Sequence, residues 1–239
     1  MKIAIIGYGK MGREIEKVAH ERGHETILKI TRENTSELTA DNLSKADVAI
    51  EFSTPSSAFE NIIQCFEARI PVVSGTTGWG DKMEEAEKIC REKEGCLFHA
   101  SNFSLGVNIL FSLNRWLAGV MDHFPQYRVN IYEVHHVHKK DAPSGTAIKL
   151  ADDLKSKLKK VEGWTGKQEG SPSLVPIKSE RKGEVPGTHI VSYKSVFDEI
   201  EISHRALGRK GFAEGAVAAG EFVKGKKGVY SMKDLLGLD

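Results

Sequence analysis

KIAIIGYGKMG, residues 2–12, decides the fold because it joins an apolar run directly to three closely spaced glycines. The apolar run is rich in isoleucine, as expected of a strand buried on both faces of a parallel sheet. Met11, Ile15 and Val18 then recur at helical spacing from within the glycine turn onward, and Gly23 ends the pattern. Strand, glycine turn and helix in this order form the opening unit of a parallel α/β sheet.

The same alternation continues through the N-terminal part of the chain. Short apolar patterns typical of buried strands lie at residues 25–30, 46–52, 71–75 and 96–100. Helical patterns separate them, one carrying Phe59, Ile62 and Phe66 and a charged one at about 80–94. Strands alternating with helices at this spacing predict an α/β, Rossmann-like domain with helices on both faces of a parallel sheet.

The rhythm changes after Asn102. A long, largely apolar helix is predicted at 105–123, and strand-like runs with little helix between them follow at 127–136, 173–180, 188–196 and 198–206. These runs predict an inserted α+β domain built on a mostly antiparallel sheet.

Helical patterns return at 212–225 and 231–238, and we expect these helices to pack on the first domain. The predicted domains are therefore residues 1–103 with 210–239, and residues 104–209. Glycine-containing polar stretches at 160–172 and 223–228 are predicted as loops.

Composition excludes several classes of function. Lysine and arginine number 34 against 33 aspartates and glutamates, a net charge of +1, so we expect no nucleic-acid or membrane partner. We expect a cytoplasmic protein, because the start lacks a signal-peptide core and no stretch approaches the roughly 18 apolar residues of a membrane span. The three cysteines form no CxxC pair, and their odd number favours reduced packing residues over disulfides.

The glycine turn predicts a dinucleotide cofactor. In the pattern GxGxxG, Gly7 can take the tight turn, Gly9 lets the backbone approach a pyrophosphate, and Gly12 permits close helix packing. Free N–H groups at the start of that helix would bind the phosphates. The alternative is that the glycines only connect a strand to a helix, and the flanking patterns favour the cofactor.

The end of the second strand bears on which dinucleotide binds. NAD-binding domains usually place Asp or Glu there to bind the ribose, whereas this chain has Thr31 and Arg32. A hydroxyl and a guanidinium suit the 2′-phosphate of NADP, which a carboxylate would repel. We therefore prefer NADPH over NADH, although Glu33 could reverse the preference and Arg32 could be a solvated loop residue.

Two more loops fall at the carboxyl ends of predicted strands, where an open α/β sheet binds its ligands. They are FSTP at 52–55, which begins with Phe52, and GTTGW at 75–79. Their small hydroxyl residues could hydrogen-bond the ribose and the nicotinamide amide, or could form simple turns.

EVHHVHKKDAPSGTA, residues 133–147, crowds three histidines and two lysines before a Pro-Ser-Gly turn. Like charges this close repel one another and imidazoles titrate near neutral pH, so a purely structural segment would have little use for them. A helix is predicted to start at the turn, where the N–H groups of Gly145 and Thr146 would bind a carboxylate. His136 and Lys139 could hold a second carboxylate by charge, so we expect an acidic small-molecule substrate.

Three interpretations of this segment compete. As a zinc site, His135, His136, His138 and Asp141 supply suitable atoms, but neighbouring strand histidines diverge and the lysines repel a cation. A solvated loop would leave the Ser-Gly-Thr helix start without a use. We prefer an acid–base and anion-binding cluster that protonates a substrate while a nicotinamide delivers hydride, and we expect no metal.

Together these motifs resemble those of the dihydrodipicolinate reductase family. The matching stretches are GYGKMG at 7–12, GTTGW at 75–79, SNFSLGVN at 101–108, EVHHVHKKDAPSGTA at 133–147 and EISHRALGRKGFAEGA at 201–216. They span nearly the whole chain in the family's order. The chain departs from the family in lacking the extra glycine of the commoner GxGGxMG turn and in placing Thr31 where an acidic residue is usual.

The resemblance implies roles for individual residues. His135 and Lys139 would be the catalytic proton-handling pair, and His136, Gly145 and Thr146 would hold the substrate carboxylates. The dinucleotide would contact Gly7, Tyr8, Gly9, Lys10, Met11, Gly12, Gly75, Thr76, Thr77, Ala100, Ser101, Asn102 and Phe103. Residues 104–209 would bind the substrate and assemble a homotetramer through their sheet.

The resemblance also implies a reaction, the NAD(P)H-dependent reduction of 4-hydroxy-tetrahydrodipicolinate, a cyclic dicarboxylate, with loss of water, in the diaminopimelate route to lysine. Two alternatives would share the N-terminal dinucleotide domain. One is another Rossmann imine or amino-acid dehydrogenase, and the other is a non-catalytic NADPH-binding sensor.

Overall fold

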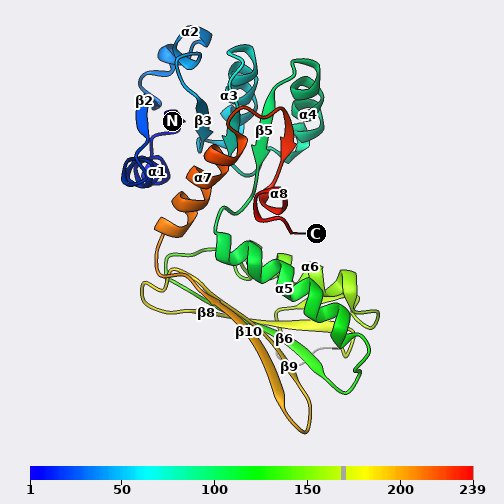
Figure 1. Cartoon of the computed structure of the whole chain (residues 1–239). Helices are drawn as coiled ribbons and strands as arrows, with labels where there is room; N and C mark the ends of the chain where they lie inside the picture. The colour runs from blue at the N-terminus through cyan, green and yellow to red at the C-terminus, as the bar shows by residue number, and fades with distance from the viewer. Residues whose placement is uncertain (168–170, 239) are drawn as a thin grey trace. The chain divides into compact units, whose positions relative to one another are not determined.

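The computed structural model describes residues 1–167 and 171–238, and the chain divides into two compact units. The first unit is Met1–Leu105 with Arg209–Asp239, and the second is Gly106–Gly208. Each unit is built around its own sheet (Figure 1). Within the described ranges, none of the helices has the length and apolarity needed to span a bilayer.

The first unit contains a six-stranded sheet in the order β11–β5–β4–β3–β1–β2. Its strands are β1 (Lys2–Ile6), β2 (Glu25–Ile30), β3 (Val48–Glu51), β4 (Val72–Ser74), β5 (Cys96–His99) and β11 (Gly228–Tyr230). Every pairing between them is parallel, so the predicted Rossmann-like sheet is confirmed. β11 was not predicted, and its first residue, Gly228, lies at the end of the stretch predicted as a loop.

Helices cover both faces of this sheet. One face packs against α1 (Lys10–Glu21), α7 (Lys210–Val223) and α8 (Met232–Leu236), and the other packs against α2 (Ala40–Leu43), α3 (Pro55–Glu67) and α4 (Met83–Glu92). Because side chains alternate along a strand, Ile3 and Ile5 of β1 enter the first core and Ala4 and Ile6 enter the second.

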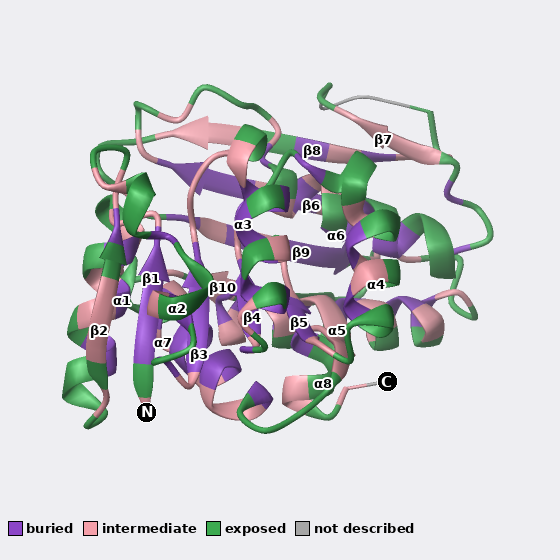
Figure 2. Cartoon of the chain, turned by 90° about the horizontal axis from the view of Figure 1, so that it is seen from above, coloured by how far each residue is buried: buried purple, intermediate pink, exposed green. Residues whose placement is uncertain are grey.

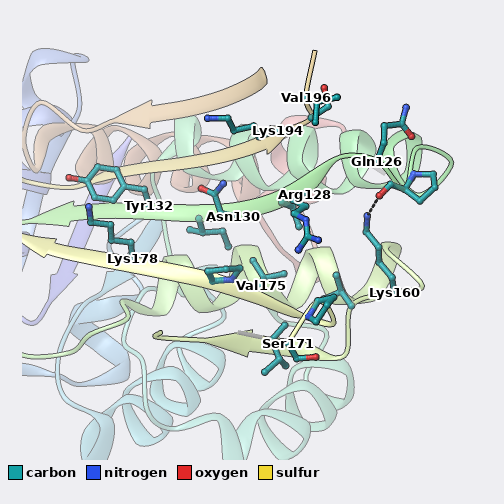
Figure 3. Close-up of a pocket in the computed structure, with 18 residues that line it drawn as sticks. Gln126, Arg128, Asn130, Tyr132, Lys160, Ser171, Val175, Lys178, Lys194 and Val196 are labelled. Carbon is teal, nitrogen blue, oxygen red and sulfur yellow. Dashed lines mark hydrogen bonds between the residues drawn. The ribbon is translucent and has the colours of Figure 1, made fainter. Parts of the chain in front are cut away.

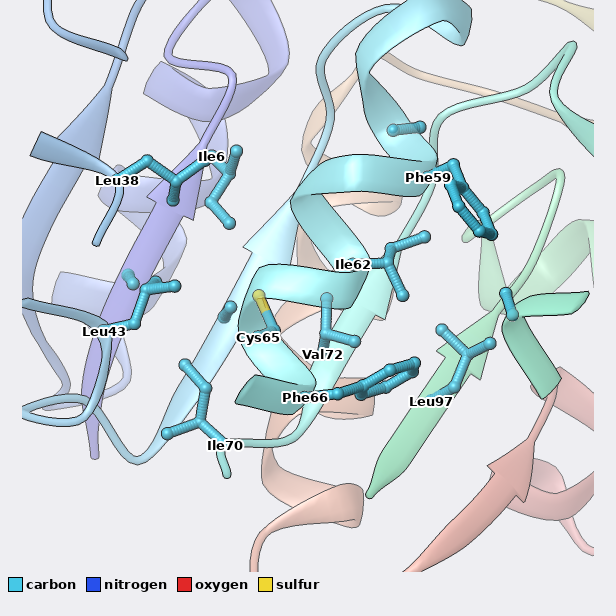
Figure 4. Close-up of a cluster of buried hydrophobic side chains, with 14 of the residues drawn as sticks. Ile6, Leu38, Leu43, Phe59, Ile62, Cys65, Phe66, Ile70, Val72 and Leu97 are labelled. Carbon is cyan, nitrogen blue, oxygen red and sulfur yellow. The ribbon is translucent and has the colours of Figure 1, made fainter. Parts of the chain in front are cut away.

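Burial on both faces explains the continuous apolar strands of the sequence. Figure 2 colours β1 and β3 largely as buried, and it colours the edge strand β2 as mostly half-buried and exposed. Figure 4 shows the core on the α3 side, where Phe59, Ile62 and Phe66 of α3 pack with Val72 of β4 and Leu97 of β5. The predicted helical face of α3 is therefore confirmed.

The second unit contains a five-stranded sheet in the order β10–β9–β6–β8–β7. Its strands are β6 (Arg128–His135), β7 (Gly163–Thr165), β8 (Leu174–Arg181), β9 (Thr188–Lys194) and β10 (Glu199–Arg205). β9 pairs antiparallel with β6 and β10, whereas β8 pairs parallel with β6 and β7, so the sheet is mixed. The parallel pairing of β6 with β8 arises because a crossover containing a helix joins them.

The short strand β7 lies inside the stretch 160–172, which was predicted as a loop. Its residues Gly163 to Thr165 pair with Leu174 to Pro176 of β8. The loop prediction is therefore wrong for this strand. Residues 168–170 of the same stretch lie outside the described residues.

Two helices cover one face of the second sheet, α5 (Leu105–Met121) and α6 (Gly145–Lys157). Their residues Leu110, Leu150 and Leu154 form a core with Ile131 of β6 and Val191 of β9. The opposite face carries a groove of about 1010 Å³ (Figure 3). Its lining includes the polar side chains of Arg128, Asn130, Tyr132, Lys178 and Lys194.

Candidate functional site

The glycine turn follows β1 and leads into α1. At two of its positions the neighbouring backbone lies so close that only glycine fits. Gly7 has a φ of +95°, and a Cβ there would lie 2.1 Å from the carbonyl oxygen of Phe52. A Cβ on Gly12 would lie 2.5 Å from the carbonyl oxygen of Gly7. Both positions exclude a side chain because backbone approaches them so closely.

Gly9 is the N-cap residue of α1, and the space that its Cβ would occupy is open. The N–H groups of the first helical turn have no acceptor within the helix, and they carry the positive end of its dipole. The turn therefore fits the pyrophosphate of a dinucleotide.

The other residues of the turn differ in exposure. Lys10 is exposed, whereas Tyr8 and Met11 are half-buried. The backbone N–H groups of Gly7 and Tyr8 both donate to the carbonyl oxygen of Ile30, at 3.0 and 2.9 Å. These hydrogen bonds fix the turn to the end of β2.

Of the two residues that follow β2, Thr31 takes part in a local turn and Arg32 is exposed to solvent. The Thr31 hydroxyl donates to Asn34 Oδ1 at 2.9 Å, and its oxygen accepts the Glu33 N–H at 3.1 Å. The hydroxyl therefore serves the local turn, which competes with a ligand for it. Arg32 is exposed, so it is the member of the predicted pair that a 2′-phosphate can reach.

A buried carboxylate joins the two hydroxyl-rich loops. Glu51 ends β3 and is fully buried. Its Oε1 accepts the Ser53 N–H at 3.0 Å and the Thr76 hydroxyl at 2.9 Å, and its Oε2 accepts the Ser74 hydroxyl at 2.8 Å. These bonds tie the loop after β3 to the loop after β4. Glu51 was not predicted, although a single carboxylate at the end of an apolar strand was a visible signal.

Phe52, Gly75 and Phe103 pack together at the same edge of the sheet. A Cβ on Gly75 would lie 2.2 Å from the Phe52 ring, so only glycine lets the ring pack there. The ring centroids of Phe52 and Phe103 are 5.4 Å apart. Of the other predicted contacts, Thr76 is buried, Ala100 and Asn102 are half-buried, and Thr77 and Ser101 are exposed. The predicted residues after β1, β3, β4 and β5 therefore meet at the carboxyl edge of the parallel sheet.

In the second unit, the histidine motif begins inside β6, and the strand ends at His135. Glu133 and His135 point to the same face because they lie two residues apart in a strand. The register places Glu133 opposite His189 of β9 and Ser179 of β8. It places His135 opposite Arg181 of β8.

Glu133 is fully buried at the centre of a polar cluster. Its Oε1 accepts the Ser144 N–H at 3.0 Å and lies 3.4 Å from the Arg181 guanidinium. Its Oε2 lies 3.4 Å from His135 Nδ1 and 3.7 Å from His189 Nε2. The two imidazole rings pack edge to face, with centroids 5.0 Å apart. We call Glu133, His135, Ser144, Arg181 and His189 the Glu133 cluster.

Burial governs the protonation of this cluster. Burial lowers the pKa of His189 to about 4. Burial also lowers the pKa of His135, and the negative charge of Glu133 opposes this effect only in part. For Glu133, burial favours the neutral acid, but hydrogen bonds from Ser144 and Ser179 outweigh it and hold the pKa below its ordinary value. The cluster near neutral pH therefore consists of neutral imidazoles beside an ionised carboxylate.

Lys139 lies in the loop after β6, where its ammonium nitrogen is 2.8 Å from Asp141 Oδ1. Arg181 holds this loop, because its guanidinium donates to the carbonyl oxygens of Lys139, at 3.2 Å, and of Asp141. Arg181 also contacts Glu133, so one guanidinium connects the lysine loop to the buried carboxylate.

The described residues considered as zinc ligands from the sequence do not form a metal site. His138 is exposed, and its Nε2 lies 3.0 Å from Glu184 Oε1. His136 is half-buried, with its ring centroid 5.9 Å from that of His138. Among the described residues, the group with metal-ligand spacing is instead Glu133, His135 and His189. The guanidinium of Arg181 beside this carboxylate opposes a cation there.

The predicted helix start is confirmed. Ser144 is the N-cap residue of α6, where its Oγ accepts the Ala147 N–H at 3.2 Å and lies 3.2 Å from His189 Nε2. The N–H groups of Gly145 and Thr146 belong to the first turn, which supplies them with no acceptor. Gly145 is exposed and Thr146 is half-buried, so this helix start suits a carboxylate next to the Glu133 cluster.

Sequence patterns missed three members of this cluster. Glu133 opens the quoted motif two residues before His135, and the two-residue period of a strand was the signal that could have found it. Arg181 and His189 lie on other strands, outside any motif, and only the register of the sheet brings them to the site.

Two family models cover nearly the whole chain. The model described as "Dihydrodipicolinate reductase, N-terminus" matches residues 1–103, and the model described as "Dihydrodipicolinate reductase, C-terminus" matches residues 106–236. The 4-hydroxy-tetrahydrodipicolinate reductase of Christiangramia forsetii is 47% identical over 236 residues, which cover 99% of this chain and 98% of that protein. The enzyme of the same name from Neisseria gonorrhoeae is 36% identical over 206 residues, which cover 82% of this chain and 75% of that protein.

Solved structures share the fold. A dipicolinate-bound dihydrodipicolinate reductase from Paenisporosarcina sp. TG-14 has a TM-score of 0.78 at 22% sequence identity, and the match covers 97% of each chain. An engineered D-amino acid dehydrogenase bound to NADP⁺ has a TM-score of 0.53 at 12% identity, covering 97% of this chain and 93% of that one. At these sequence identities, the two matches show only that the fold is shared.

Proposed function

The chain belongs to the dihydrodipicolinate reductase family, and from this premise we infer that it is a 4-hydroxy-tetrahydrodipicolinate reductase, an oxidoreductase of the diaminopimelate route to lysine. The observation that carries this conclusion is the 47% identity to a reductase of that name over 99% of the chain. The reaction reduces the cyclic dicarboxylate with a nicotinamide dinucleotide and releases water.

The first unit would hold the dinucleotide at the carboxyl edge of its sheet. Gly9 leaves room for the pyrophosphate above the first turn of α1, and Glu51 keeps the two hydroxyl-rich loops in place beside the Phe52 ring. NADPH is the preferred cofactor in this proposal, because Arg32 is exposed where the 2′-phosphate would lie, and NADH is the alternative. When bound, the nicotinamide supplies a hydride to the electrophilic C=N side of the substrate ring.

The second unit would hold the substrate and move the proton. The N–H groups of Gly145 and Thr146 would bind one carboxylate, and His136 would bind the other. Lys139 carries an ammonium that Asp141 holds at 2.8 Å, so we assign it as the proton donor. His135, whose pKa burial lowers, is the neutral imidazole that would accept or relay a proton as water leaves C4.

Assembly and location complete the proposal. A homotetramer formed through the second sheet is supported by the open face of that sheet, with its groove of about 1010 Å³. The side chains of Val196 and Phe197, beyond the end of β9, are 90% and 84% exposed and would be covered in such an assembly. Sedimentation velocity tests this, and a monomer at micromolar concentration would contradict it. A cytoplasmic location is part of the same proposal.

The direct test is oxidation of NADPH, followed by absorbance, with freshly generated 4-hydroxy-tetrahydrodipicolinate. We expect the parent to consume NADPH, and we expect His135→Gln and Lys139→Ala to lower kcat by roughly 10²- to 10⁴-fold, as for loss of a general acid or base. His138→Gln and Lys140→Ala are matched controls, because these neighbours in the same segment are exposed. Both controls should keep close to the parent rate.

Three outcomes contradict parts of the proposal. A parent that binds NADPH but consumes none with this substrate is a sensor or acts on something else. A parent that instead turns over amino acids or simple imines is another Rossmann dehydrogenase. Full turnover by both His135→Gln and Lys139→Ala would show that the proton-handling residues lie elsewhere.

A further inference from the structure

We propose that Glu133 is a positioning residue of the reductase, whose buried carboxylate orients the His135 imidazole and holds the lysine loop and the start of α6 beside it. This inference rests on the proposed function, since it assigns a role toward His135 and Lys139 in that reaction. It is carried by the geometry of the Glu133 cluster.

The first step of the argument is the way in which the carboxylate connects separate segments. Glu133 itself lies on β6, and its Oε1 receives the Ser144 N–H at the start of α6 and faces Arg181 of β8. Its Oε2 faces His189 of β9 and His135 at the end of its own strand. One carboxylate thus contacts residues of β6, α6, β8 and β9, and it reaches the Lys139 loop through Arg181.

The second step is that Glu133 acts through other groups. Its side chain is 0% exposed, so neither substrate nor cofactor can touch it without rearrangement of the sheet. The hydrogen bonds to Oε1 come from Ser144 and Arg181, and Arg181 continues to the carbonyl oxygen of Lys139. Loss of the carboxylate would therefore remove a charged partner of the guanidinium that holds the Lys139 loop.

The third step concerns the orientation of His135. Its Nδ1 is buried and lies 3.4 Å from Glu133 Oε2, a separation that a modest tightening turns into a hydrogen bond. A carboxylate at that distance favours the tautomer with a proton on Nδ1. Nε2, which faces Gly187, is then left without a proton and can accept one.

The fourth step is the charge around His135. The groups that face it are Glu133 of β6, His189 of β9, Arg181 of β8, and Lys139 and Asp141 of the following loop. Lys139 and Arg181 disfavour an imidazolium, and burial disfavours it further. Glu133 is the buried anion that counters them. Without its charge, His135 would take up a proton only at a lower pH.

The kinetic test compares Glu133→Gln with the parent over a range of pH. Gln has nearly the same shape but no charge, so we expect kcat to fall and the acidic limb of kcat/KM to move by about one pH unit or more to lower pH. Asp153→Asn is the matched control, because Asp153 is a buried carboxylate of the same unit that pairs with Arg115 and Lys149 outside the cluster. It should keep the parent's acidic limb.

Glu133→Asp separates charge from geometry. It keeps the carboxylate but withdraws it by one methylene, so we expect the acidic limb to stay near that of the parent while kcat falls. Parent-like kcat and an unmoved limb in Glu133→Gln, beside an inactive His135→Gln, would overturn the role of Glu133 and leave the proposed function standing.

A second measurement needs neither activity nor a variant of Glu133. ¹⁵N spectra of the histidine-labelled protein, assigned with His135→Gln, should show His135 protonated on Nδ1 in its neutral form. Protonation on Nε2 instead would overturn the inference, whether or not Glu133→Gln folds. If the parent fails to reduce the substrate, the proposed function fails, and the spectrum still decides the orientation of His135.

Discussion

Gly215 lies on the buried side of α7, where the helix meets the backbone at Phe103. A Cβ at this position would lie 1.8 Å from the carbonyl oxygen of Phe103 and 2.9 Å from its carbonyl carbon. Ordinary contacts of a Cβ begin at about 3.4 Å, so Gly215→Ala would push the two segments apart by roughly 1.5 Å. The obstacle is backbone, which cannot rotate away as a side chain can.

The magnitude follows from two opposing effects. Overpacking costs about 1–3 kcal/mol, and a clash with backbone belongs at the upper end of that range. The better helix propensity of alanine returns about 1 kcal/mol at most. The free energy of unfolding should therefore fall by about 2 kcal/mol, which lowers the Tm by roughly 4–8 °C for a protein of this size. Because Phe103 packs on Phe52, the KM for the dinucleotide should rise as well.

Thermal unfolding followed by circular dichroism provides the assay, and the same helix provides the control. A Cβ on Gly220 would meet Val48 and Ile50 at 3.6 and 3.7 Å, which are ordinary contact distances. Gly220→Ala should therefore match the parent or gain up to about 1 kcal/mol from helix propensity. If Gly215→Ala unfolds at or above the temperature of the parent, the close packing of α7 on Phe103 is refuted.

Three further predictions concern the cofactor, the buried carboxylate and pH. Arg32→Ala should raise the KM for NADPH by roughly tenfold or more, which corresponds to the loss of a hydrogen bond to a charged group, and it should leave the KM for NADH unchanged. An equal rise in the KM for both cofactors in steady-state kinetics would contradict this. Glu51→Ala removes the carboxylate that accepts hydrogen bonds from Ser53, Ser74 and Thr76. It should lower the free energy of unfolding by about 2–4 kcal/mol in urea titrations, and a loss under about 1 kcal/mol would show that the loops do not depend on it. Burial lowers the pKa of His189 to about 4 in the folded protein. Between about pH 4 and the ordinary pKa of about 6.5, the unfolded chain therefore binds a proton at His189 more readily than the folded protein does. Stability should fall as the pH is lowered through this window, by up to about 3 kcal/mol, and His189→Gln should flatten the fall measured by denaturation at each pH.

Much of the first unit could be predicted because its strands are apolar on both faces and its helices are amphipathic. β2 was predicted with its observed bounds. β7 and β11 escaped prediction because each has three residues and no apolar run, so each exists only through its pairing with a longer strand. The parallel half of the second sheet was missed for a related reason, since strand direction depends on the crossover and not on local pattern.

The candidate site divides in the same way. His135, Lys139 and the helix start at Gly145 come from one contiguous stretch, so local patterns singled out this segment, and the resemblance to the family supplied the roles of His135 and Lys139. Arg181 and His189 reach the cluster from strands β8 and β9, and no periodicity in the sequence indicates the register that places them there. The hydrogen bond of the Thr31 hydroxyl to Asn34 was not indicated by any pattern either, because it depends on the conformation of the turn.

The division of the first unit between two distant segments has a consequence for synthesis on the ribosome. α7, which covers the sheet face formed by Ile3, Ile5, Val48 and Ile50, leaves the ribosome only after the intervening unit Gly106–Gly208. At roughly 5–20 residues per second, that delay is about 5–20 s. During this interval α1 alone among the helices of that face is available to the nascent sheet, and the part that α7 will cover stays exposed to the translation machinery and its chaperones. The first unit is thus completed only after the inserted unit has been synthesised.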